Sequence, residues 1–199
     1  MTVSGASVSD PSGGDSSVRD SSGGDSSGRD SSTGGAAGAF PGDRFAALLH
    51  DPRRAGLYAC DPDHGIERWY AAAGAAGLLT VVVDLEHAGS KRAVMDAFAD
   101  ALGLPEYFGG NWDALDECLR DNAWHEPRDA ARGGLMLRID GAASAAGAAP
   151  EAFETMVELL DDAVESWRDR GIACWVLVAT DHPDEFALEA LPAFDEARP

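Results

Sequence analysis

Three carboxylates lie within five residues of the chain: Asp113, Asp116 and Glu117. In a helix that begins at Asn111, this spacing would place all three on one exposed face. Like charges at this spacing weaken a helix, and only Asp113, in the first turn, is favoured by the helix dipole. A face that weakens its own helix indicates a role other than stability. The apolar residues of the same helix would face the core, namely Trp112, Leu115, Cys118 and Leu119.

Carboxylates at this spacing could act as acid and base in catalysis, bind a metal ion or meet a cationic partner. The chain has no Gly-rich phosphate loop and no HExxH, GxSxG or calcium-loop pattern, and its five histidines are scattered. We therefore predict a protein that is not an enzyme and holds no metal or cofactor. A solvated acidic helix face is the plain alternative.

The cysteines indicate neither a disulfide framework nor a zinc site. They are odd in number, widely spaced and without a CxxC pair. Reduced, buried thiols in a cytoplasmic protein fit this usage best. The three are Cys60, Cys118 and Cys174.

The net charge is −20, from 35 acidic and 15 basic residues. Residues 1–39 carry five aspartates and two arginines, so most of the excess lies on residues 40–199. Nucleic acids and anionic membranes are polyanions and are disfavoured as partners. The charge favours a cationic partner, or it serves solubility alone.

The chain divides into three parts by composition. Residues 1–39 contain a Ser/Gly/Asp-rich repeat that cannot bury enough surface to order, so we expect a disordered tail. Residues 40–183 form the predicted domain, and residues 184–199 an acidic C-terminal tail in which three apolar residues are available to dock locally. The N-terminus lacks a basic start and an apolar run, and the longest apolar stretch, 71–83, is too short to span a bilayer. We expect a cytoplasmic location. The three apolar residues of the tail are Phe186, Leu188 and Leu191.

Buried strands alternate with helices along the domain. This order predicts an α/β fold, with a small parallel sheet of three to four strands flanked by helices. Ser90 and Gly103 are the expected ends of one helix, and Asn111 is the expected N-cap of the next. The expected strands are 56–61, 78–84, 135–139 and 172–180. The expected helices are 66–76, 90–102, 112–121 and 150–170. Before them, Phe45, Leu48 and Leu49 also have helical spacing.

The segment around the three acids resembles the signature of the barstar family. That signature is a Leu-Pro-x-Tyr-Tyr/Phe-Gly-x-Asn-x-Asp-Ala-Leu run that leads to an acid and a Cys-Leu pair. The order of strands and helices around the motif agrees as well, so the resemblance covers about residues 78–181 and leaves 40–77 as an addition. Eleven of sixteen positions match: Leu104, Pro105, Tyr107, Phe108, Gly109, Asn111, Asp113, Ala114, Leu115, Cys118 and Leu119.

The resemblance implies an inhibitor that plugs the active site of a secreted, basic ribonuclease. By position, Asp113 and Glu117 would be the principal anions and would stand where RNA phosphates bind. Tyr107 and Asn111 would be loop contacts. Glu165 matches a further family acid, on the long helix, to within one residue.

Two positions depart from the family pattern. The residue before the second acid is commonly aromatic, and here it is Asp116. The second acid is usually Asp, and here it is Glu117. Both changes keep the charge and alter the fit, so Asp116 stays in the predicted binding set while the target is left open.

Three hypotheses follow from the sequence. The first is an inhibitor of a basic nuclease, including an immunity protein against a nuclease toxin. The second is a module of the same fold for another cationic partner, and the third is a carboxylate-dependent hydrolase. For the first we expect a monomer when free, with no nucleic acid and no membrane as partner.

Overall fold

The computed structural model describes residues 41–63, 65–104, 108–120 and 133–191, with only the backbone for 41–43. Five strands form one sheet in the order β2-β3-β4-β1-β5, and every adjacent pair is parallel. The α/β class and the parallel sheet are confirmed, with one strand more than the three to four expected. The strands are β1 (Leu57–Cys60), β2 (Leu79–Asp84), β3 (Leu135–Asp140), β4 (Cys174–Ala179) and β5 (Glu189–Ala190).

The central strands bury side chains on both of their faces. Leu137 and Val176 point into one hydrophobic core, whereas Met136 and Trp175 point into the other. Successive residues of a strand face opposite sides of a sheet, so these uninterrupted apolar runs require helices on both sides.

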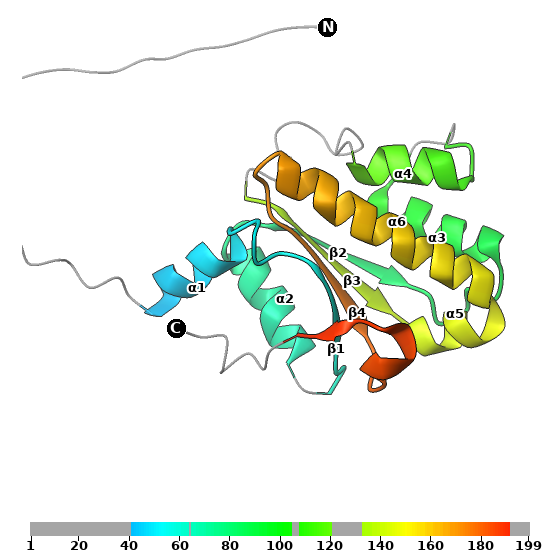
Figure 1. Cartoon of the computed structure of the whole chain (residues 1–199), viewed down its shortest axis with the longest axis horizontal. Coiled ribbons are helices and arrows are strands. Elements are labelled where there is room, and N and C mark those ends of the chain that lie inside the picture. Colours follow the sequence, from blue (N-terminus) through cyan, green and yellow to red (C-terminus); the bar gives the residue numbers. More distant parts are fainter. Residues whose placement is uncertain (1–40, 64, 105–107, 121–132, 192–199) are drawn as a thin grey trace, which may run out of the picture. The chain divides into compact units, whose positions relative to one another are not determined.

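Two layers of helices supply that cover, as Figure 1 shows. The helices α3 (Lys91–Leu102), α5 (Ala142–Ala148) and α6 (Pro150–Asp169) bury residues in the first core. The helices α1 (Pro41–Leu49) and α2 (Ile66–Ala75) build the second. The helix α4 (Trp112–Arg120) packs on α6, at the outer side of the first layer.

The expected helix signals are confirmed at α3 and α6. The hydroxyl of Ser90 accepts a hydrogen bond from the backbone N–H of Ala93 at 3.2 Å, and Gly103 ends α3 in the left-handed conformation. Gly171 follows α6 with a φ of 72°. The helix α5 was not predicted, because its small residues, mostly alanine, show no apolar period.

The segment before β2 forms the second core rather than a peripheral addition. Trp69 and Trp175 lie 5.6 Å apart between ring centroids, and both are almost fully buried. The indole N–H of Trp175 donates to the carbonyl of Leu49 at 2.8 Å. On the other side of the sheet, Arg168 of α6 donates to the carbonyl of Ala55, just before β1. Residues 41–60 are thus tied to both β4 and α6.

Part of the C-terminal segment is ordered on the domain. Residues Pro183–Phe186 form a 3₁₀ helix, and the ring of Phe186 packs on Phe153 at 4.9 Å between centroids. The two residues of β5 pair with β1. The predicted tail, 184–199, therefore begins with structured residues, and 192–199 lie outside the described residues, as does the predicted tail 1–39. Within the described ranges, no helix has both the length and the apolar character to cross a membrane.

Two deletions test which parts of the chain the fold needs. Removal of residues 1–39 should leave the melting temperature nearly unchanged, because their composition offers little to bury. Removal of residues 1–77 should abolish cooperative unfolding, because it uncovers Met136, Trp175 and Leu177, which are buried in the second core. Each such side chain contributes about 1.5–3 kcal/mol when buried, against a total stability of about 5–15 kcal/mol. Circular dichroism melts of both variants decide this, and a cooperative melt of the shorter one would contradict it.

Candidate partner-binding site

The start of α4 is capped by Asn111, which follows two glycines. The side-chain oxygen of Asn111 accepts from the backbone N–H of Ala114 at 2.9 Å, which confirms the predicted N-cap. Gly110 has a φ of 58°, a conformation that favours glycine. At Gly109, a Cβ would lie 2.9 Å from the amide nitrogen of Asn111, so a larger residue would disturb the cap.

The inner side of α4 is held by α6. Leu115 and Leu119 are buried, as expected, whereas Trp112 and Cys118 are only half-buried. The buried indole N–H of Trp167 donates to the carbonyl of Leu119 at 2.7 Å. The last carbonyls of a helix lack partners within the helix, so this bond satisfies one of them. The guanidinium of Arg170 donates to a second, the carbonyl of Arg120.

The outer side of α4 presents two of the three predicted acids freely. Asp113 and Glu117 are exposed, lie one helical turn apart and form no ion pair with any described residue. They leave two unbalanced negative charges on a convex helix surface. Such charges are well hydrated when the protein is free and available to a cation that approaches.

Asp116 differs from these two. Its carboxylate accepts from Nε of Arg120 at 2.6 Å, and only 28% of its side chain is exposed. Nη2 of Arg120 reaches across to the carboxylate of Asp162 on α6 at 3.0 Å. The hydrogen bond to Asp116 is the main cause that raises the pKa of the Arg120 guanidinium above its ordinary value. Asp116 is therefore engaged within the molecule rather than projecting with the other acids.

The remaining predicted residues lie around α4. Asn111 is exposed at the start of the helix. Glu165 is exposed on α6, three residues after Asp162, which places it on the part of α6 that meets the end of α4. Tyr107 lies outside the described residues. The link from Arg120 to Asp162 was missed, and only the spacing of Asp116 and Arg120, four residues apart, could have indicated part of it.

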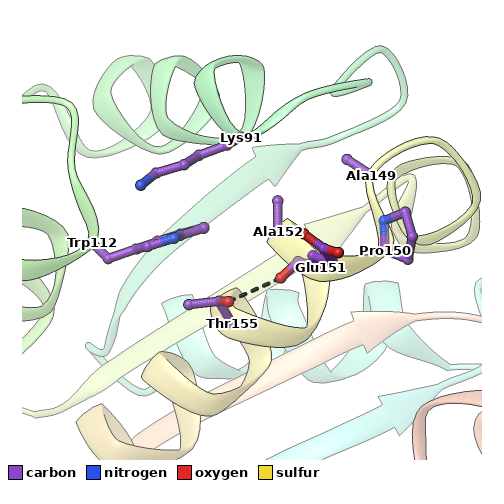
Figure 2. Close-up of a pocket in the computed structure, with 7 residues that line it drawn as sticks. All are labelled: Lys91, Trp112, Ala149, Pro150, Glu151, Ala152 and Thr155. Atoms are coloured by element: carbon purple, nitrogen blue, oxygen red, sulfur yellow. Dashed lines mark hydrogen bonds between the residues drawn. The ribbon is translucent and has the colours of Figure 1, made fainter.

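A cavity of about 480 Å³ opens beside the start of α4 (Figure 2). The ammonium of Lys91 lies 5.3 Å from the ring centroid of Trp112, and the opposite wall is the first turn of α6. None of the predicted acids Asp113, Asp116 and Glu117 lines this cavity. The acids are thus displayed on an outer surface and not gathered in the hollow.

The described residues offer little for metal or thiol chemistry. Among them, no three His, Cys, Asp or Glu side chains come together as metal ligands. Cys60 and Cys174 are buried, which confirms the expectation for these two, while Cys118 on α4 is half-buried. Burial is the main cause that raises the pKa of Cys60 to about 11 and that of Cys174 to about 12.

A comparison with protein-family models finds a match over residues 78–179, to the family described as Barstar (barnase inhibitor). The matched segment covers about half of the chain. It includes β2, α3, α4, β3, α5, α6 and β4, and it leaves out α1, β1 and α2. No curated protein matches the chain.

The bond from Trp167 to Leu119 should set the stability of α4. Trp167→Phe removes the indole N–H and leaves a buried carbonyl without a donor, at a cost of about 1–3 kcal/mol. Hydrogen exchange of the amides in α4 should then become faster. Trp175→Phe is the matched control, because it removes an equivalent bond to Leu49 on the other side of the sheet. If the amides of α4 exchange as slowly in both variants as in the parent, the bond from Trp167 to Leu119 does not stabilise the helix.

The thiols should differ in reactivity with a water-soluble maleimide at pH 8. Thiolate forms only as the pH approaches the pKa, and the raised values for Cys60 and Cys174 keep both protonated at this pH. The native protein should therefore incorporate one label, at Cys118, and three after denaturation, as counted by mass spectrometry. Cys118→Ser should incorporate none when native. Rapid native labelling of Cys174 would mean that β4 opens far more readily than its burial indicates.

Proposed function

The chain belongs to the barstar family, and from that premise we propose that it binds and blocks the active site of a basic ribonuclease with the acidic face of α4. The family description names a barnase inhibitor, so the family role is binding to a protein and not catalysis. We infer the same for this chain: an inhibitor and not an enzyme.

One observation carries the proposal. Asp113 and Glu117 are exposed on consecutive turns of α4 and have no ion-pair partner among the described residues. Asp113 gains from the helix dipole, but Glu117 lies beyond the first turn and repels Asp113, so the helix itself does not need this pair of acids. They become favourable when a cation stands opposite each of them.

The proposed mechanism follows from the charge of a ribonuclease active site. A cleft that binds RNA is cationic, because it has to neutralise phosphates. A protein with a net charge of −20 is attracted to such a cleft before contact, which raises the association rate. Once docked, Asp113 and Glu117 take the places of phosphates, and the convex helix fills the cleft and excludes the substrate.

The other predicted residues have secondary roles in this proposal. The side-chain oxygen of Asn111 is already used in the cap, so its amide nitrogen is the group that can contact the partner. Glu165 extends the negative surface from α4 onto α6. Tyr107 enters the proposal on the resemblance alone. Asp116 has a smaller role than the sequence indicated, because it is bound to Arg120.

A different cationic protein as the partner is the second candidate. It is favoured by Glu117, which is one methylene longer than the usual family residue and alters the fit to a cleft shaped for Asp. With either partner, we propose that this chain is a cytoplasmic monomer when free and that it binds neither nucleic acid nor membrane. Capture of proteins on the immobilised chain, followed by mass spectrometry, would identify the partner.

Substitution of the two exposed acids tests the proposed function. Asp113→Ala and Glu117→Ala should each weaken binding to the ribonuclease by about 2–5 kcal/mol, mostly through faster dissociation, because each change strands a desolvated cation in the partner. That range comes from charge pairs of this kind in general, the barnase–barstar complex among them. Melting temperatures should barely change. Calorimetric titration against barnase and against any captured nuclease, alongside thermal melts, makes the measurement.

Two controls sharpen this test. Glu154→Ala removes an exposed acid of α6 outside the proposed surface, and it should leave binding nearly unchanged. Glu117→Asp keeps the charge and restores the usual family residue, so a loss there shows a target fitted to the longer side chain. The association rate should also fall as NaCl rises, over a screening length of about 10 Å at 0.1 M. Alanine variants that fold and bind like the parent would refute α4 as the inhibitory element.

A further inference from the structure

Arg120 places a positive charge at the end of α4, between two acidic side chains. It is the last residue of α4 and the only basic residue in that helix. Its side chain is 39% exposed, and it lies between the carboxylate of Asp116 on its own helix and that of Asp162 on α6. A surface built only to attract cations would have no use for this residue.

The ion pairs of Arg120 divide the acids around α4 into two sets. Asp116 and Asp162 share one guanidinium, so their two negative charges are offset by one positive charge. Asp113 and Glu117 have no such partner among the described residues. A partner thus meets two free carboxylates along α4, and beside them a cation that already has its counter-ions.

The charge of Arg120 is not needed to hold α4 in place. Leu115 and Leu119 are buried beneath the helix. The carbonyl of Leu119 is bonded by Trp167, and Arg170 donates to the backbone carbonyl of residue 120, which any side chain there would keep. Ion pairs at such exposure contribute little to stability.

We propose that Arg120 is a specificity-determining residue, which withholds the carboxylates of Asp116 and Asp162 from the cations of the partner nuclease. This inference rests on the proposed function. A cation of the partner that approaches Asp116 or Asp162 also approaches the guanidinium of Arg120, and this like-charge repulsion weakens its attraction to the two acids. The matching partner has two cations about one helical turn apart, for Asp113 and Glu117, and does not rely on Asp116 or Asp162.

The test compares Arg120→Gln with Arg92→Gln in the full chain. Arg92 forms an ion pair of the same spacing, with Asp96 four residues further along α3, so both variants lose one charge and one pair within a helix. Only Arg120→Gln also loses the pair with Asp162. Inhibition of barnase, whose cleft must bind RNA phosphates, is measured at fixed salt for the parent and both variants. Arg120→Gln should inhibit about tenfold or more better than the parent, and Arg92→Gln about as well as the parent.

The double variant Arg120→Gln/Asp116→Asn separates the two parts of the proposal. If release of Asp116 contributes, part of the gain should be lost when that carboxylate becomes an amide. Equal inhibition by Arg120→Gln and Arg92→Gln overturns the role of Arg120, while the proposed function stands if Asp113→Ala still weakens inhibition. No inhibition of barnase by the parent or by either variant overturns both for this ribonuclease. Thermal melts of each variant exclude loss of the fold as the cause.

Discussion

The burial of β3 and β4 on both faces is the constraint on which the rest of the structure depends. Alternate residues of these strands enter two separate cores, so neither layer of helices can be omitted. The first layer places α6 between β3 and β4 in the chain, and α6 carries α4 on its outer side. The second layer comes from α1 and α2, outside the segment that matches the family. The segment that matches the family model therefore packs here against residues that lie outside that match.

The position of α4 explains how a short helix can present charges without collapsing. Nine residues of isolated helix would be marginal in water, and two unpaired acids weaken it further. Two buried leucines and the hydrogen bond from Trp167, all on the side that faces α6, offset this loss of helix stability. Because the stabilising contacts all lie on the inner side, the outer side is free to carry residues chosen for a partner. In the proposed function, stability and binding therefore depend on opposite sides of one helix.

The sequence predicted what depends on local signals and missed what depends on distant contacts. The caps at Ser90 and Asn111 and the helix end at Gly103 need only neighbouring residues, and all three are confirmed. The two-residue strand β5 exists only because β1 offers it an edge, so no pattern could predict it. The engagement of Arg120 with Asp162 joins residues 42 positions apart. For the candidate site, the motif identified the helix and its exposed acids, but not that Asp116 is held within the molecule.

Net charge and local charge have different consequences for this protein. A charge of −20 attracts any basic protein from a distance and so cannot by itself distinguish one nuclease from another. That attraction acts on association and is screened by salt, whereas the few pairs that lose water at the centre of an interface control dissociation. In the proposed complex, discrimination therefore has to come from where the acids stand along α4 and from the cation beside them. Under that proposal, the contacts of Arg120 matter as much as the two free acids, because they determine how many carboxylates of the helix a cationic cleft can use.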